Sequence, residues 1–269
     1  PGHSSPDLSR GERASSEEGP RVNAVITAGG LVGGDFARTI GTEVEALAPL
    51  GRTTLLERAI DAARGAGAEQ IAVVGGDDVR DRCRACVERV IEASSDGGEN
   101  ALLALASWES GPLLYLTSDL PFITARAVRE FLERSSPFAL TMPLADADAY
   151  EARFPQAPEH VVELGGERVA NGNIFFIAPA ALAPLRHWAV RFFEARKNKL
   201  AMARMLGPSL LFRFLLRKLT IGAIERKAAR GLGVSVAAIR GADPAVCYDV
   251  DTLEEYTYAL EHLRKRALS

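Results

Sequence analysis

The sequence is poor in the residues that mark secreted, membrane-spanning and nucleic-acid-binding proteins. Its 269 residues include three cysteines, an odd and low number that does not build a disulfide framework, so we expect a cytoplasmic protein. No apolar run reaches the length of a membrane span, and no signal-peptide hydrophobic region stands near the N-terminus. Lysine and arginine number 32 against 35 acidic residues, which argues against a general nucleic-acid binder.

Zinc sites are not indicated either. Cys83 and Cys86 form a C-x-x-C pair, but a zinc site needs about four ligands and no second pair is present. The four histidines are scattered through the sequence without ligand spacing. We therefore treat the cysteines as structural and assign the histidines no role.

The remaining composition, 47% apolar and 25% charged, is that of a soluble globular protein. Residues 1–20 are Ser, Pro, Gly and charge, and we expect a disordered tail. From residue 21 to 269, apolar strand candidates alternate with amphipathic helix candidates, beginning with a strand at 22–28 and a helix at 53–67. This alternation predicts one three-layer α/β/α domain with a mostly parallel, doubly wound sheet, whose ligands bind beyond the carboxyl ends of the strands.

The second half of the chain is less regular. A strand–turn–strand unit with antiparallel pairing is expected over 160–179, followed by a helix at 180–194. Residues 196–233 are helical in pattern and basic, which predicts an insertion or lid. Part of that segment, 209–219, is apolar with interspersed arginines; a lid or dimer face is favoured there over contact with an anionic membrane. Strands at 234–240 and 245–250 and a helix over 252–266 complete the expected fold.

A glycine cluster follows the first strand. Gly29, Gly30, Gly33 and Gly34 would let backbone N–H groups approach phosphate oxygens, because glycine has no Cβ to clash. The cluster matches neither the P-loop nor the dinucleotide fingerprint, and the first lysine of the chain is Lys197. A simple tight turn remains the alternative interpretation.

Acidic residues stand at two further strand ends. Asp119 follows the apolar run of "LLYLTSDLPFI", where a carboxylate would be a hard oxygen ligand for Mg²⁺ on a nucleotide phosphate; the alternative is a helix N-cap, a role that Thr124 can also fill. Asp249 and Asp251 in "CYDVDTLEEY" would share one face of a strand and could complete a metal site with Asp119. Alternatively, Asp251 caps the next helix and Asp249 is solvated.

The order of these pieces resembles the MobA-like nucleotidyltransferases, which include molybdenum cofactor guanylyltransferase and relatives that make CDP- or GDP-activated metabolites. The resemblance rests on "AGG", "APLGRTTLLERAIDAARGAGAEQIAVVGG", "LTSDLPFIT", "GNIFFIAP" and "DVDTLEEY" in this order, over most of 21–269. It implies a GT-A-like nucleotidyltransferase fold that binds an NTP, with GTP or CTP favoured, and Mg²⁺. It further implies that a small phosphorylated acceptor attacks the α-phosphorus and that pyrophosphate leaves.

The resemblance also implies roles for individual residues. Asp119, Asp249 and Asp251 would hold the metal, and Arg38 and Lys197 would meet phosphate groups alongside Asp119 as catalytic residues. Asn173 would lie toward the acceptor, with Arg196 beside it in a basic cluster that could equally be a solvated helix start. The nucleotide-binding candidates are Ala28, Gly29, Gly30, Gly75 and Asn100.

One departure from the family pattern stands in the opening segment. The family carries a lysine shortly before "LLPLG", and this chain has Glu45 there; an acid facing a triphosphate repels it. The substitution keeps open a non-catalytic nucleotide-binding or sensing paralogue. A sugar-nucleotide-dependent glycosyltransferase is a third hypothesis, although the D-x-D motif usual at the central strand tip is missing, because "SDL" offers a single acid.

Overall fold

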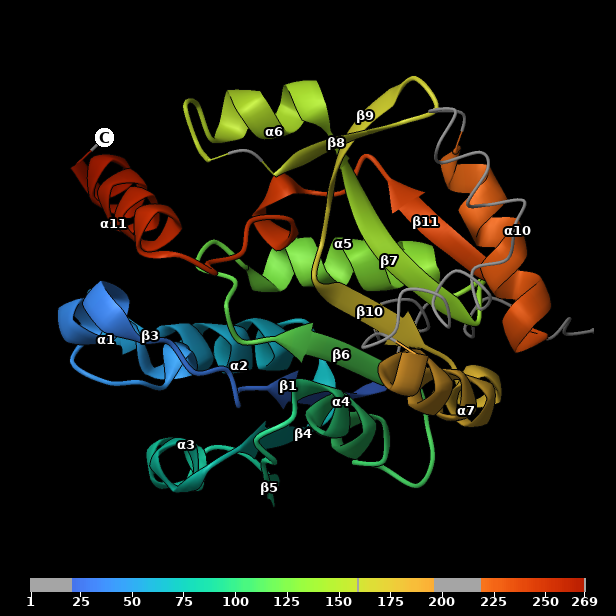
Figure 1. The fold of residues 1–269 in the computed structure, drawn as a ribbon, viewed down its shortest axis with the longest axis horizontal. Helices are drawn as coiled ribbons and strands as arrows, with labels where there is room; N and C mark the ends of the chain where they lie inside the picture. The colour runs from blue at the N-terminus through green and yellow to red at the C-terminus, as the bar shows by residue number, and fades with distance from the viewer. Residues whose placement is uncertain (1–20, 159, 196–218, 269) are drawn as a thin grey trace, which may run out of the picture.

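A computed structural model describes residues 21–158, 160–195 and 219–268. The expected tail, 1–20, and most of the expected basic insertion, 196–218, lie outside the described residues. The described chain forms a mixed sheet of nine strands with helices on both faces (Figure 1). The expected α/β/α class is therefore confirmed. No helix among the described residues is long and apolar enough to cross a membrane.

The first half of the sheet is parallel. Its strands run in the spatial order β5-β4-β1-β6, with parallel pairing at each step. These strands are β1 (Val22–Thr27), β4 (Ala68–Gly75), β5 (Arg89–Glu92) and β6 (Leu113–Thr117). Because β4 lies on one side of β1 and β6 on the other, the chain reverses its direction of winding between β1 and β6.

The second half of the sheet is mixed. The order continues β10-β7-β9-β8, with antiparallel pairing at each of these junctions, while β11 pairs in parallel with β7. Its strands are β7 (Leu140–Asp146), β8 (Val161–Leu164), β9 (Glu167–Asn171), β10 (Ile174–Ile177) and β11 (Val236–Arg240). The pairing directions leave β9 and β10 running against all the other strands. The mostly parallel sheet was predicted correctly. The 160–179 unit has the expected antiparallel pair, β8 and β9, but it contains a third strand, β10, which pairs with β6 and β7 instead.

Alternating side chains of the strands fill two cores. Ala24 and Ile26 of β1 belong to the larger core, whereas Val25 between them belongs to the second. Helices α2 (Leu55–Gly65) and α5 (Ala125–Ser135) cover the larger core, and α4 (Gly97–Leu105) and α7 (Pro179–Ala195) cover the other face. The remaining elements are α1 (Gly34–Ile40), η1 (Glu45–Leu47), β2 (Pro49–Leu50), β3 (Thr53–Thr54), α3 (Asp77–Cys83), α6 (Ala147–Arg153), α10 (Ile221–Leu232), η2 (Pro244–Val246) and α11 (Leu253–Leu268).

Capping explains why α2 begins where it does. The Thr54 side chain accepts a hydrogen bond from the Glu57 amide at 3.2 Å, and the Glu57 carboxylate accepts one from the Thr54 amide at 2.8 Å. This reciprocal pair satisfies two backbone donors that a helix start would otherwise leave unpaired. The helix then follows the apolar spacing that predicted it.

Two regions differ from expectation. The expected strand at 245–250 is instead the short 3-10 helix η2 followed by an irregular segment. Conversely, β7 and α6 have no counterpart among the elements expected from the sequence. Pro143 stands inside β7, and a proline, which lacks a backbone donor, normally argues against a central strand. Here its carbonyl still accepts the Gly172 amide at 2.9 Å.

Candidate active site

The candidate site lies where the sheet changes its direction of winding. β1 and β6 are neighbours, and their tips are tied by a hydrogen bond from the Ser118 amide to the Thr27 carbonyl at 3.1 Å. The glycine loop leaves β1 at this edge, and Asp119 follows β6. Ligands of open α/β sheets bind in the crevice at such a switch point.

Close packing explains the first two glycines of the loop. A Cβ on Gly29 would stand 2.8 Å from Asn100 Nδ2, and one on Gly30 would stand 2.6 Å from Glu45 Oε2. Both approaches are closer than real Cβ contacts. The buried, hydrogen-bonded Asn100 amide cannot give way, whereas the end of the flexible Glu45 side chain would only have to move. Gly33, by contrast, has open space around it. The loop thus follows a path that glycine permits, with Ala28 buried at its root.

Asn100 and Gly75 have structural duties at the same edge. The Asn100 side chain is buried; its Oδ1 accepts the Ser94 amide at 2.7 Å and its Nδ2 donates to the Ser94 carbonyl at 3.0 Å. It therefore fixes the loop after β5 against Gly29. A Cβ on Gly75 would lie 2.4 Å from Val79 Cγ1, so glycine is required where β4 turns into α3. Direct nucleotide contact by either residue stays a prediction.

Asp119 projects from the tip of β6 with its orientation fixed. Thr117 Oγ1 donates to Asp119 Oδ1 at 2.5 Å, and the backbone carbonyl of Asp119 accepts the Val250 amide at 3.1 Å. Helix α5 is capped by Thr124, whose hydroxyl accepts the Ala127 amide at 3.2 Å. The N-cap alternative for Asp119 is therefore wrong.

Asp249 and Asp251 reach the same point from the segment before α11. Contrary to the expectation of a strand, they lie in an irregular segment. Val250 between them is fully buried, so the two carboxylates project away from the core. One ligand atom from each of Asp119, Asp249 and Asp251 lies within 4.8 Å of the others. Helix α11 is preceded by Thr252, which accepts the Glu255 amide at 3.3 Å, so Asp251 is not its cap.

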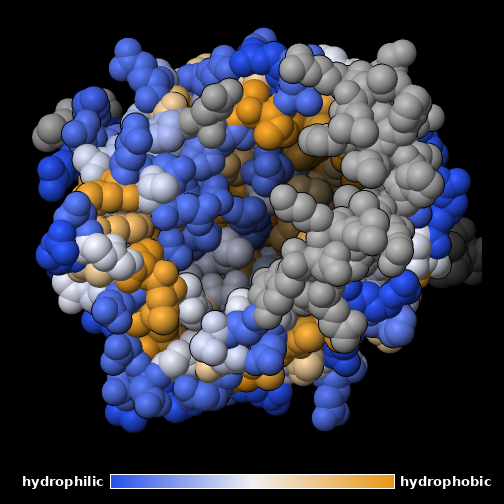
Figure 2. Space-filling model, in the orientation of Figure 1, coloured by the Kyte–Doolittle hydropathy of each residue, from blue (hydrophilic) through white to orange (hydrophobic). Residues whose placement is uncertain are grey.

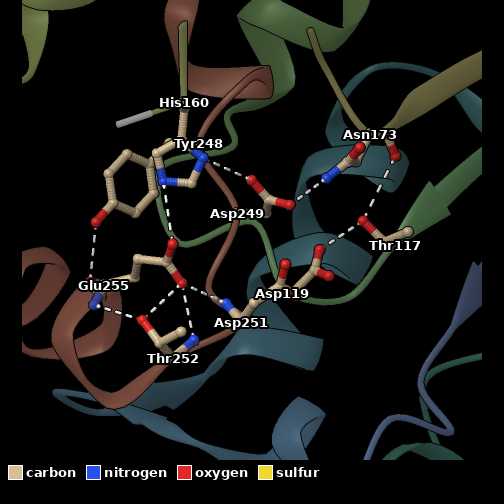
Figure 3. A network of polar contacts seen from close by, with 9 residues as sticks. All are labelled: Thr117, Asp119, His160, Asn173, Tyr248, Asp249, Asp251, Thr252 and Glu255. Carbon is tan, nitrogen blue, oxygen red and sulfur yellow. Dashed lines mark hydrogen bonds and ion pairs between the residues drawn. The ribbon is translucent and has the colours of Figure 1, made fainter. Parts of the chain in front are cut away.

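Hydrogen bonds from two other parts of the chain hold Asp249 (Figure 3). Asn173 Nδ2 donates to Asp249 Oδ2 at 2.6 Å, and His160 Nδ1 lies 3.2 Å from Asp249 Oδ1. The alternative of a merely solvated Asp249 is therefore wrong. Asn173 was singled out from the sequence, whereas His160, which stands in an irregular stretch before β8, carries no sequence signal beyond being a histidine.

The gathered acids change one another's proton affinity. Burial, together with the charges of Asp249 and Asp251, raises the pKa of Asp119 to about 7, against a smaller lowering effect of its Thr117 hydrogen bond. Burial and Asp249 likewise raise the pKa of Asp251. Burial alone would lower the pKa of His160, but its hydrogen bond to Asp249 and the nearby carboxylates outweigh that and raise it. The cluster therefore favours binding a positive charge.

Glu45 belongs to the same acidic surroundings. Its amide donates to the Gly30 carbonyl at 3.1 Å, which places it beside the glycine loop. Burial, followed by the charges of Asp119, Asp251 and Asp249, raises its pKa to about 8. Near pH 7 this carboxyl is therefore largely neutral before a cation binds, which reduces the repulsion expected from the sequence.

The predicted cations are less well defined. Arg38 pairs with Asp35 on an exposed face of α1, with 74% of its side chain accessible. Arg196 and Lys197 lie outside the described residues. In Figure 2, hydrophilic side chains gather on the face that carries the segment leading into α11. The roles of these three cations toward phosphate stay predictions.

Comparisons with known proteins found a matching family model and similar solved structures. A family model described as the MobA-like NTP transferase domain matches residues 24–207. A hypothetical transferase from Thermus thermophilus is 29% identical, with a TM-score of 0.76 over 87% of this chain and 99% of that one. No curated protein matches the sequence.

More distant solved structures share the fold. A nucleotidyl transferase from Methanothermobacter thermautotrophicus is 15% identical, with a TM-score of 0.56 over 91% of this chain and 99% of that one. The 2-C-methyl-D-erythritol 4-phosphate cytidylyltransferase of Thermus thermophilus is also 15% identical, with a TM-score of 0.55 over the same shares. Together with the family match over more than half of the chain, these findings show that it belongs to the MobA-like NTP transferase family.

Proposed function

We propose that this protein is an enzyme that transfers an NMP group from an NTP to a small phosphorylated acceptor and releases pyrophosphate. The observation that carries the proposal is that ligand atoms of Asp119, Asp249 and Asp251 lie within 4.8 Å of one another, beside the glycine loop. The family to which the chain belongs supports the same activity. The three free cysteines support the cytoplasm as its compartment.

The donor set fits a magnesium ion. Three carboxylates supply the hard oxygen ligands that Mg²⁺ prefers, and Mn²⁺ accepts the same set. The raised pKa of Asp119 reflects burial and mutual repulsion among these acids, and a divalent cation relieves both. When bound, the ion would neutralise charge on the phosphates during transfer.

The protein's own residues would position the reactants. Backbone groups of Ala28, Gly29 and Gly30 would bind the nucleotide, with Asn100 holding the loop in place. An acceptor phosphate oxygen forms the new bond to the α-phosphorus while the bond to pyrophosphate breaks. Since that oxygen is already anionic, the step needs orientation and charge stabilisation more than a general base. Asn173, near Asp249, is our acceptor-binding candidate.

GTP and CTP are the nucleotides we propose. One structural neighbour, from Thermus thermophilus, is a cytidylyltransferase of 2-C-methyl-D-erythritol 4-phosphate. A CMP:2-keto-3-deoxy-manno-octonic acid synthetase, 12% identical with a TM-score of 0.54, was solved in complex with CTP. At such low identity these neighbours share the fold, so the nucleotide base and the acceptor have to be found by experiment.

Two assays test the proposal. Thermal-shift measurements with each NTP, with and without Mg²⁺, should show stabilisation that needs both, and pyrophosphate release should appear with one of a panel of sugar and alcohol phosphates. Asp119→Ala should remove the Mg²⁺-dependent stabilisation and lower the rate of pyrophosphate release on the order of 10²–10³-fold. Asp148→Ala is the matched control, because that aspartate is 97% exposed on α6. If Asp119→Ala binds Mg²⁺ and nucleotide like the wild type, the site assignment is wrong.

Glu45 supports a second candidate, a nucleotide-binding protein without turnover. It stands in place of the family's lysine and belongs to the acidic cluster, so the site has one cation fewer for the triphosphate. Metal-dependent nucleotide stabilisation without pyrophosphate release, across the whole acceptor panel, would favour this candidate over the enzyme.

A further inference from the structure

We propose that His160 is a positioning residue that locks the carboxylates of the metal site in place; this inference rests on the proposed function. His160 Nδ1 lies 3.2 Å from Asp249 Oδ1, and His160 Nε2 lies 3.5 Å from Glu255 Oε1. All three side chains are at most 20% exposed. One imidazole thus contacts two acids of the site, one with each nitrogen (Figure 3).

We call the two contacts of His160 the clamp. Its first arm, the contact with Asp249, fixes the Asp249 carboxylate. Asn173 Nδ2 donates a hydrogen bond to Asp249 Oδ2 at 2.6 Å, and His160 Nδ1 contacts Asp249 Oδ1. Two donors on opposite oxygens determine the plane of the group, so Asp249 is held ready beside Asp119 and Asp251. The Asp251 carboxylate, in contrast, accepts no hydrogen bond from any described residue, and its position depends on its backbone.

The second arm supports that backbone. Glu255 Oε2 accepts the amides of Asp251 and Thr252, each at 2.8 Å. His160 Nε2 lies 3.5 Å from the other oxygen of Glu255, an ion-pair contact without a hydrogen bond. The histidine therefore connects Asp249 directly, and Asp251 through Glu255, so that both acids of the segment before α11 share one anchor.

Aromatic packing keeps the imidazole in this place. The His160 ring lies 4.9 Å from the ring of Tyr248 and 6.0 Å from that of Tyr150, both of them fully buried or nearly so. Tyr150 comes from α6, and His160 from the stretch before β8. The clamp thus ties the metal-binding segment to the mixed half of the sheet. Outer partners of metal ligands typically change affinity by about 10- to 100-fold when removed.

The clamp can be tested without turnover by measuring Mn²⁺ binding to the full chain. The EPR signal of the free ion reports how much Mn²⁺ remains unbound. His160→Ala should weaken Mn²⁺ binding about 10- to 100-fold. His160→Asn keeps a donor where Nδ1 stood, facing Asp249, and should bind within a few-fold of wild type. His160→Gln keeps a donor where Nε2 stood, facing Glu255, and should fall between the alanine and asparagine variants. His187→Ala, on the exposed face of α7, is the matched control and should bind like wild type.

The outcomes separate the two proposals. If Asp119→Ala loses Mn²⁺ while His160→Ala binds it like wild type, the clamp is refuted and the metal site stands. If Asp119→Ala keeps full Mn²⁺ affinity, the metal site is refuted and the clamp with it. Should His160→Ala fail to fold, equal Mn²⁺ affinity of the asparagine and glutamine variants would also refute the clamp.

Discussion

The two halves of the sheet build the candidate site by different means. In the parallel half, Asp119 and the glycine loop stand at strand ends, where regular hydrogen bonding sets their position. In the mixed half, Asp249 and Asp251 stand on an irregular segment. Asn173 and His160 contact the Asp249 carboxylate, and the Glu255 carboxylate accepts the Asp251 amide. The first half derives its geometry from the backbone, whereas the second derives it from a polar network. The second should therefore be easier to disturb.

The largest effect should come from breaking both halves at once. Asp119→Ala and Asp251→Ala should each lower the rate of pyrophosphate release on the order of 10²–10³-fold, the cost of losing one charge-stabilising group. Because both acids would serve one ion, the double variant should lose at most a few-fold more than the worse single variant. Multiplied losses would show that the two halves act separately.

The turn between β9 and β10 in the mixed half should be sensitive to one added methyl group. A Cβ on Gly172 would stand 2.5 Å from Pro143 Cγ and 2.6 Å from the Val246 carbonyl oxygen. Gly172→Ala should therefore lower the free energy of unfolding by about 1–3 kcal/mol, measured by urea denaturation. Gly33→Ala, with no atom within 4 Å of its added Cβ, is the control. Equal stability of the two variants would contradict the close packing around Gly172.

The stability of the metal-free protein should depend on pH through Asp119. Its pKa, about 7 in the folded state against 3.8 in the unfolded chain, means that the folded state holds a proton that the unfolded state releases between these values. The contribution is present at low pH and is lost as pH rises through 7, with a slope of at most about 1.4 kcal/mol per pH unit. Unfolding in EDTA should thus show stability that falls between about pH 4 and 7 and levels off above pH 7.

Two comparisons check that assignment. Asp119→Asn should flatten the pH dependence, because its amide does not titrate, whereas Asp148→Asn at the exposed control position should leave it unchanged. Saturating Mg²⁺ should flatten it as well, since the cation favours the ionised carboxylate. A pH dependence that survives in Asp119→Asn would assign the titration to another group, with Glu45 the first to examine.

The smallest effect is expected at Glu45. Its pKa of about 8 in the metal-free site makes the carboxyl largely neutral at pH 7, so Glu45→Gln should change the free energy of unfolding in EDTA at that pH very little. Glu45→Lys restores the cation of the family pattern and should lower the KM for the NTP. A large loss of rate in Glu45→Gln would show that an ionised Glu45 is needed, for instance on the metal.

The sequence predicted the parallel half better than the mixed half. The position of Asp119 at the sheet edge was predicted, because an acid directly after a buried strand has a definite place there. Asp249 and Asp251 were paired correctly, but through strand alternation, whereas burial of Val250 in an irregular segment sets their direction. β7 escaped notice because Pro143 interrupts it.

The polar network illustrates what the sequence does not encode locally. His160 meets Asp249 across 89 positions of the chain, a separation that follows from the residue numbers, and no spacing pattern marks such a contact. The family pattern had directed attention to Asn173. His160 was assigned no role, because a histidine alone in an irregular stretch is indistinguishable from a surface residue until the fold is known.

The central claim is that Asp119, Asp249 and Asp251 bind one divalent ion together with a nucleotide. The most direct measurement is a crystal grown with Mn²⁺ and CTP or GTP, in which anomalous scattering locates the metal. We expect one peak in contact with all three carboxylates, at about 2.1 Å from their oxygens as for other small hard cations, and touching a nucleotide phosphate. A bound nucleotide whose metal lies away from these carboxylates would contradict the account.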